Sequence, residues 1–357
     1  MENEQRVNMR EVAKQAGVSA PVVSAVLLGD RARARTVRFS PATAERVTQV
    51  ANELGYIPNR LTRSVVHREP FALAAIAPWP HHDRYSDILR ALALHCRNDD
   101  LHLLVEPSTF EHADILERLR DLAALQIGAV ALIPSASQEV VAESVIQQHR
   151  EHREICPHLC CVDWFFDEVV YDCVTIDERL SMALPLRHLA ERGHRRIALL
   201  GTATERRLRL LREEARTLGL EDSLERMEEG LVADRNIDEC DIPELARRLL
   251  RRKPRPTAIY CLRDSYALIT FGICEREFGL RVGTDVALIG QDDTPMAQWL
   301  PTPLTSLNHR NAEAAAALYQ LMIGRMRKNK LPPKPICHMI EPELIVRASS
   351  AQPAPTT

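Results

Sequence analysis

From Phe71 onward, short apolar segments alternate with longer amphipathic ones, and this alternation limits the possible folds more than any other feature of the sequence. Strands that alternate with helices form parallel sheets through right-handed crossovers. The pattern predicts about ten strands, too many for one comfortable sheet, so we expect an α/β body of two doubly wound parallel-sheet subdomains. The predicted strands are 71–78, 101–106, 128–134, 158–163, 173–176, 196–201, 228–233, 257–262, 285–290, a short one after Pro303 and one near 343–347.

Amphipathic segments between these strands predict the helices that cover the sheets. Ligands of such folds bind beyond the carboxyl ends of the strands, so the cleft between the two subdomains is the expected binding site. The predicted helices are 85–98, 112–126, 138–150, 179–192, 205–218, 241–252, 265–278 and 311–328.

The first 57 residues have a different pattern, which predicts a small all-α head of three helices. The first helix is Met9–Ala16, and Gly17 supplies the positive φ of a tight turn. Ser19 is a natural N-cap for the second helix, which makes a helix–turn–helix. A third helix begins at Ser40-Pro41 and stops at Gly55.

Charge is distributed unevenly along the chain. The 357 residues carry a formal net charge of −3, which argues against a nucleic-acid partner. Residues 1–69, however, hold 11 Lys/Arg against 7 Asp/Glu, so this part is +4 and the remainder −7. A basic head on an acidic body is typical of a nucleic-acid-binding module joined to another domain.

Several classes of protein are disfavoured by the sequence. No apolar run approaches the roughly 20 residues of a membrane span, and the N-terminus does not resemble a signal peptide, so we expect a cytoplasmic protein without a membrane partner. The 9 cysteines, an odd and scattered set, fit a reducing compartment. Phosphate-cradling loops, dinucleotide fingerprints and nucleophile elbows are missing, so neither an enzyme nor a cofactor is expected.

Two short clusters invite a metal interpretation. His81-His82-Asp83 is one, and the segment 156–161, which holds Cys156, His158, Cys160 and Cys161, is the other. Neither cluster has a second half at the spacing that closes a tetrahedral site, so we expect no metal.

Motifs spread over nearly the whole chain resemble the lactose-repressor (LacI/GalR) family. The resemblance implies a periplasmic-binding-protein-like body of type I and a transcriptional regulator, expected to be a repressor, that binds operator DNA as a homodimer. The motifs are residues 10–19 (REVAKQAGVS), 23–27 (VSAVL), 40–43 (SPAT), 54–59 (LGYIPN), 162–164 (VDW), 188–198 (HLAERGHRRIA), 207–208 (RL), 290–293 (GQDD), 303–306 (PLTS) and 342–347 (PELIVR).

The resemblance also implies a division of the chain. The head is 1–58, a hinge helix or linker is 59–70, and a tail is 351–357. The body, 71–350, is expected to divide into subdomain one, about 71–172 and 294–328, and subdomain two, about 173–293 and 329–350.

The head is expected to bind double-stranded DNA with the second helix in the major groove. Ala20, Pro21 and Ala25 would face base edges, and none can form a bidentate hydrogen bond to a base. Specificity there would rest on apolar contact and DNA shape. Further residues match the family's phosphate-contacting positions, although the hydroxyls could equally be helix caps and surface groups: Ser19, Ser24, Ser40, Thr43, Tyr56 and Asn59.

Two basic segments extend the expected DNA surface. The loop 30–38 carries four arginines, with Arg33 and Arg35 as predicted phosphate contacts, although a solvated loop is the alternative. Residues 60–67 match the family's hinge helix, in which Arg63 would contact DNA and Val65 would wedge into the minor groove.

Five residues are predicted to line the effector cleft. Arg207 matches the family's effector-binding arginine, with Arg206 and Arg209 as competitors, and Asp264 matches its aspartate although Arg263 replaces the usual asparagine. Trp79, Tyr85 and Asp163 lie at strand ends of the first subdomain, where aromatic faces suit sugars or nucleobases. Ordinary packing is the alternative for Trp79, and it is favoured for Trp164.

The resemblance leaves the effector open. It implies a small sugar-like or nucleobase-like ligand that shifts the two subdomains and so biases the hinge. A regulator with a vestigial cleft is the alternative, because Gln291 replaces a usual aromatic residue in the cleft lining. A solute-binding protein is a remote one, since it would lack the DNA-binding head.

Overall fold

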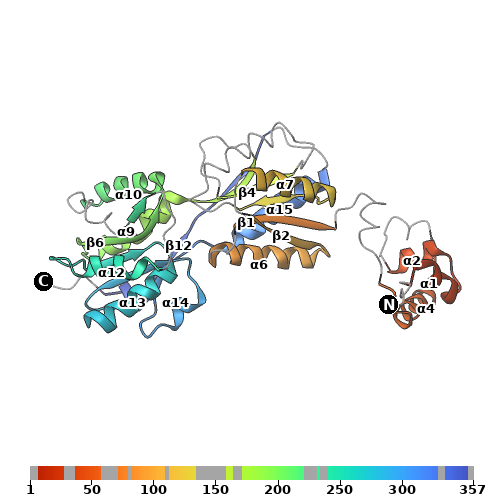
Figure 1. The fold of residues 1–357 in the computed structure, drawn as a ribbon, viewed down its shortest axis with the longest axis horizontal. Helices are drawn as coiled ribbons and strands as arrows, with labels where there is room; N and C mark the ends of the chain where they lie inside the picture. The colour runs from red at the N-terminus through yellow and green to blue at the C-terminus, as the bar shows by residue number, and fades with distance from the viewer. Residues whose placement is uncertain are drawn as a thin grey trace. The chain divides into compact units, whose positions relative to one another are not determined.

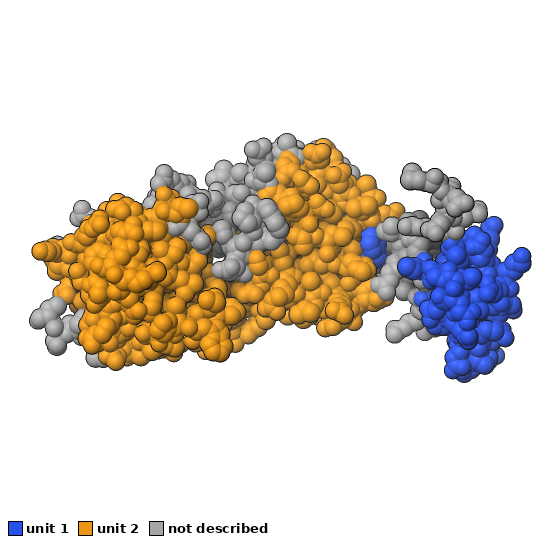
Figure 2. All heavy atoms as spheres, turned by 60° about the horizontal axis from the view of Figure 1, so that its bottom comes forward, with its two compact units in different colours: residues 1–71 blue, residues 72–357 orange. Residues whose placement is uncertain are grey.

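The computed structural model describes residues 7–27, 37–57, 71–78, 83–108, 112–133, 158–163, 171–220, 231–233, 240–328 and 334–352. They fall into a head unit, 1–71, and a body unit, 72–357 (Figure 2). In the described residues no helix is long and apolar enough to cross a membrane.

The described head has the predicted helices, α1 (Met9–Ala16), α2 (Ala20–Leu27) and α4 (Pro41–Glu53). Asn8 and Glu11 form a capping box at the start of α1, and Gly17 ends that helix with φ 65°. Val12, Val23 and Val47 are fully buried where the helices meet, so the expected helix–turn–helix core is confirmed.

The body contains two sheets, each of which Figure 1 shows with its own set of helices. The described strands of the first sheet have the order β11-β5-β4-β3-β1-β2, and all of their pairings are parallel. Their bounds are β1 (Ala72–Pro78), β2 (His102–Ser108), β3 (Val130–Leu132), β4 (Leu159–Val162), β5 (Asp172–Ile176) and β11 (Cys337–Ile340).

The second sheet has the order β12-β10-β9-β8-β6-β7 and is parallel except for the pairing of β10 with β12. Its strands are β6 (Ile197–Ala203), β7 (Leu231–Ala233), β8 (Ala258–Cys261), β9 (Ala287–Gln291), β10 (Thr305–Asn308) and β12 (Glu343–Ile345). Two parallel sheets in one body confirm the predicted fold class.

Helices cover these sheets because the central strands are apolar on both faces. On the first sheet, α6 (Asp83–Asn98) packs beside α15 (Asn311–Lys328), while α7 (His112–Ala124) contacts β1 and β2. On the second sheet, α9 (Glu178–Glu191) and α10 (Glu205–Thr217) share one core. The other core holds α12 (Ile242–Leu250), α13 (Asp264–Phe278) and part of α14 (Pro295–Trp299).

The sheets divide the body differently from the expected ranges. Strand β5 pairs with β4 and so belongs to the first sheet, and β10 pairs with β9 and so belongs to the second. The strand β11, which the sequence did not predict, returns to the first sheet before β12 joins the second. An apolar run identifies a strand but not its neighbour, which explains the misplaced boundaries near 172, 294 and 329.

The described chain therefore passes between the sheets three times, from β5 to α9, from β10 to α15 and from β11 to β12. At the first and third passages the strands are tied together, because the Asp177 amide donates to the Ile340 carbonyl at 3.0 Å. The predicted helix 138–150, the hinge 60–67 and the His81-His82 pair lie outside the described residues.

Candidate functional site

The start of α2 offers a small, weakly polar surface. Ser19 and Pro21 are exposed, and Ala20 is half-buried. Ser24 and Ala25, by contrast, are only 3% and 5% exposed, so the structure places these two predicted DNA contacts inside the head. The sequence pattern could not show that these two residues face the inside of the head, because most residues of the short helix α2 are apolar.

The start of α4 presents a second set of predicted contacts. The Ser40 hydroxyl accepts a hydrogen bond from the Thr43 amide at 3.2 Å, and the two hydroxyl oxygens lie 2.9 Å apart. Ser40 is thus the N-cap of α4 and is also exposed, so the capping and contact roles are compatible. Tyr56, half-buried behind α4, has its pKa raised by burial.

Some predicted site residues lie outside the described part of the chain. They are Arg33, Arg35, Asn59, Arg63, Val65 and Trp79, together with Trp164.

In the body, a buried ion pair links the end of β4 to the start of α6. Asp163 directly follows β4, and Arg84 stands at the start of α6. The Arg84 guanidinium binds both Asp163 carboxylate oxygens, with Nη2 donating to Oδ1 at 2.9 Å and Nη1 to Oδ2. Their side chains are 11% and 1% exposed, so the two charges compensate one another out of water.

Tyr85 completes this side of the site. It is buried beneath Arg84, whose guanidinium carbon lies 5.4 Å from the ring centroid. Burial, followed by the neighbouring Asp163 charge, raises the pKa of the Tyr85 phenol, so the group stays protonated at neutral pH. The Arg207 charge opposes that shift, which places Arg207 near the pair although it comes from the second sheet.

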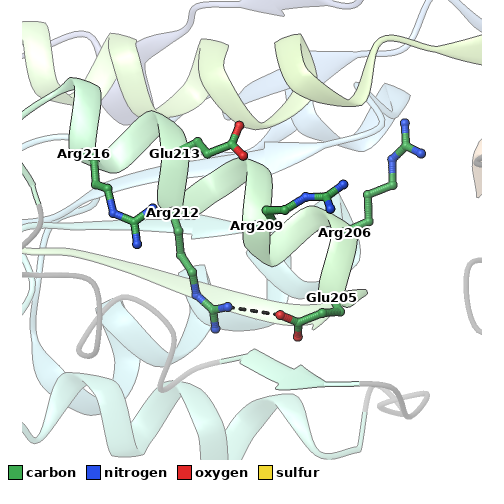
Figure 3. A pocket seen from close by; sticks show the side chains of 6 residues that line it. All are labelled: Glu205, Arg206, Arg209, Arg212, Glu213 and Arg216. Atoms are coloured by element: carbon green, nitrogen blue, oxygen red, sulfur yellow. Dashed lines mark hydrogen bonds and ion pairs between the residues drawn. The ribbon is translucent and has the colours of Figure 1, made fainter. Parts of the chain in front are cut away.

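Arg207 extends from the first turn of α10. Its Nε donates to Glu178 Oε1 at 3.0 Å, at the start of α9. Burial lowers the pKa of Arg207, but the Glu178 carboxylate raises it and the net shift is upward. Its competitors Arg206 and Arg209 lie on the face of α10 that lines a pocket, where Arg206 pairs with Glu178 Oε2 at 2.8 Å and the Arg209 side chain points toward Arg206 (Figure 3).

A chain of polar groups runs from the second sheet toward these arginines. The Tyr260 hydroxyl donates to Gln291 Oε1 at 2.9 Å, and Gln291 Nε2 lies 2.8 Å from His309 Nε2. The Gln291 side-chain oxygen accepts the hydrogen bond from Tyr260, so its side-chain nitrogen donates to His309 Nε2. A neutral His309 that accepts at Nε2 carries its own proton on Nδ1. Burial and the charges of Arg84 and Arg207 hold the pKa of His309 well below its usual range.

Asp264 occupies a different environment from the other cleft candidates. At the start of α13, its Oδ2 accepts from the Thr294 amide at 2.7 Å and from the Thr294 hydroxyl, and its Oδ1 accepts from Ser306 at 2.6 Å. Burial raises its pKa to about 6. Any Cβ at Gly290 would lie 2.1 Å from this carboxylate, so that strand position requires glycine.

The structure thus brings together Tyr85, Asp163 and Arg207. Asp264, by contrast, is held by Thr294 and Ser306 of the second sheet and its connections. Sequence reasoning missed Arg84, Glu178 and His309. Arg84 could have been found as the neighbour of Tyr85 at the start of the helix that follows the first strand. The described residues contain no group of three His, Cys, Asp or Glu that could hold a metal ion.

Comparison with known families decides the identity of the chain. Residues 8–59 match the bacterial regulatory proteins of the lacI family, and residues 186–350 match a periplasmic binding protein-like domain. The chain belongs to the lacI family. The resemblance seen in the sequence is confirmed. The first matched region corresponds to the described head, and the second covers most of the second sheet and its helices together with α15 and β11 of the first sheet.

Full-length relatives and solved structures agree with this assignment. The lacI-family chain is 22% identical to the ribose operon repressor of Haemophilus influenzae, covering 96% of this chain and 98% of that protein. It is 25% identical to the repressor CytR of Escherichia coli, covering 97% of each. A lac repressor dimer bound to operator and the anti-inducer ONPF has a TM-score of 0.72 at 21% identity, covering 97% and 99%, which establishes the fold.

Proposed function

We propose that this lacI-family protein is a sequence-specific DNA-binding transcriptional regulator, acting as a repressor, whose operator affinity is switched by a small ligand. The ligand binds between the two body subdomains, the protein acts as a homodimer in the cytoplasm, and no enzymatic step is involved. The observation that carries the proposal is one chain with a capped helix–turn–helix head and a buried polar cluster where its two sheets meet.

Two buried donors in that cluster indicate what the ligand offers. Within the described residues, Arg84 Nε and His309 Nδ1 have no hydrogen-bond partner. A buried donor without an acceptor costs about 1–3 kcal/mol, so a ligand oxygen or ring nitrogen that accepts from either group would gain that energy. Hydroxyl-bearing sugars and nucleobases both carry such acceptors. Relatives include a ribose operon repressor, and a CelR complex with cellobiose is a structural neighbour.

A thermal-shift screen of the full-length protein against sugars, sugar phosphates and nucleobases tests this proposal. We expect at least one compound to raise the melting temperature and to change operator affinity in fluorescence anisotropy. Arg207→Gln should abolish the shift, whereas Arg209→Gln, on the pocket-lining face of the same helix, should retain it. Equal loss in both variants would contradict the assigned site.

A second candidate is a DNA-binding regulator with a vestigial cleft. Its support is that the charges of the cluster already neutralise one another, Arg84 with Asp163 and Arg207 with Glu178. If no compound stabilises the protein while an operator selected from random DNA is bound tightly, this candidate replaces the ligand-responsive one. Failure to select any DNA sequence would overturn both.

A further inference from the structure

Three cysteines lie side by side on adjacent strands at one edge of the first sheet. In the strand register, Cys161 of β4 is opposite Cys173 of β5, and Cys173 is opposite Cys337 of β11. Residues opposite one another in parallel strands point to the same face of the sheet. The described row therefore brings three thiols from segments far apart in the sequence onto one face.

The spacing of Cys173 and Cys337 suits a covalent bond. Paired strands lie about 4.7–4.9 Å apart, and disulfide-bonded cysteines have Cα separations of about 4.4–6.8 Å. The two thiols interact with one another, because each shifts the pKa of the other. The strand spacing is therefore within the range of Cα separations that disulfides use.

The two thiols differ in their access to solvent. Cys337 is exposed on the edge strand, while Cys173 is fully buried. The interaction with Cys173 lowers the pKa of Cys337 to about 7, and the same interaction, followed by burial, raises the pKa of Cys173. An exposed thiolate next to a protonated buried thiol is the arrangement of an attacking and a resolving cysteine.

We propose that Cys173 and Cys337 form a reversible disulfide when the protein meets a hydroperoxide. The Cys337 thiolate attacks the peroxide oxygen, breaks the O–O bond and becomes a sulfenic acid, while the leaving oxygen takes up a proton to form water or an alcohol. Cys173 sulfur then attacks the sulfenic sulfur, the S–S bond forms, and hydroxide leaves with the Cys173 proton as water. Two thiols are oxidised and one peroxide is reduced.

The position of this bond gives it a structural consequence. Strand β5 leads into α9 and strand β11 leads into β12, so the disulfide joins two of the three described passages between the sheets. It would prevent β11 from separating from its only partner among the described strands. This consequence concerns the body alone and does not depend on the proposed function.

The test uses the reduced full-length protein treated with one equivalent of hydrogen peroxide, then alkylated under denaturing conditions and digested for mass spectrometry. We expect a peptide linking Cys173 to Cys337 that disappears after reduction with dithiothreitol. Cys240→Ser, which removes another exposed cysteine, should leave the linked peptide unchanged. Cys337→Ser should abolish it.

The resolving role has a separate readout. Cys173→Ala should leave Cys337 as a sulfenic acid that dimedone traps, whereas the wild type should give little adduct at that position. Circular dichroism checks that this buried substitution leaves the fold intact, and Cys337→Ser, at an exposed position, provides an independent variant. A link of Cys173 to Cys161 instead, or peroxide reactivity of Cys337 no greater than that of Cys240, would overturn the proposal.

Discussion

At the scale of single residues, the body depends on buried charges held by a specific partner. Arg84 binds Asp163, Arg325 binds Asp172, and Arg347 Nη2 donates to Asp293 Oδ1 at 2.6 Å. Each pair joins segments distant in the sequence, so these contacts specify which strands and helices meet. Removing one partner would leave a charge in a poorly hydrated site.

Asp163→Ala should therefore lower the free energy of unfolding by about 3–5 kcal/mol, because Arg84 would remain buried without its counter-charge. Urea denaturation measures the change. The double variant Arg84→Met with Asp163→Ala should regain part of the loss. Asp285→Ala, which breaks the exposed pair with Arg281, should cost much less, because water screens that pair. Equal losses at the two aspartates would contradict the argument.

Acid should destabilise the protein through its buried histidines. His194, 1% exposed, has its pKa lowered to about 4 by burial and bonds the Thr257 hydroxyl at 3.0 Å. At pH values below the usual histidine pKa of 6.5, the unfolded chain binds a proton at His194 that the folded chain does not bind. The free energy of unfolding therefore falls as the pH decreases toward 4.

Between pH 6.5 and 4, His194→Asn should reduce the dependence of unfolding free energy on pH by up to about 1.4 kcal/mol per pH unit. Urea titrations at several pH values measure this slope. Asp264, whose pKa is raised to about 6, makes stability increase as the pH falls, but it contributes equally to the wild type and to His194→Asn and so does not affect their difference. His338→Gln, at an exposed position, should leave the slope unchanged.

At the scale of elements, the helices and buried strands could be predicted because each carries a strong local signal. Amphipathic spacing and the Ser40-Pro41 start placed α4, and a continuous apolar run placed β4. The edge strand β11 was not predicted, because its residues, CHMI, are mostly exposed and show no apolar alternation. Partners, such as Arg84 for Asp163, could not be predicted, since they depend on which strands become neighbours.

The start of α4 allows capping and DNA contact to be separated. Ser40→Ala should cost about 1 kcal/mol of stability by removing the cap, and it should also weaken operator binding. Ser40→Asp should keep the cap and the melting temperature but weaken operator binding further, because its carboxylate would face a phosphate. Anisotropy titrations and thermal melts measure the two effects. Wild-type affinity in Ser40→Asp would exclude this DNA contact.

At the scale of the whole molecule, the uneven charge has a measurable result. Replacing Arg31, Arg33, Arg35 and Arg38 with serine should weaken binding to all DNA sequences alike. The slope of log affinity against log salt should fall by up to about 3.6 per head if all four neutralise phosphates. Replacing four body arginines, Arg209, Arg212, Arg216 and Arg251, is the matched control and should leave the slope unchanged. The same slope in both variants would assign the loop to solvent.

The three described passages of the chain between the sheets limit how the body can move. A single link would let the two halves swing apart freely, whereas three links restrict how they can separate. Cleavage of one link by a protease would still leave the halves joined through the other two. A displacement of one half therefore acts on the other through more than one link, which couples their movements.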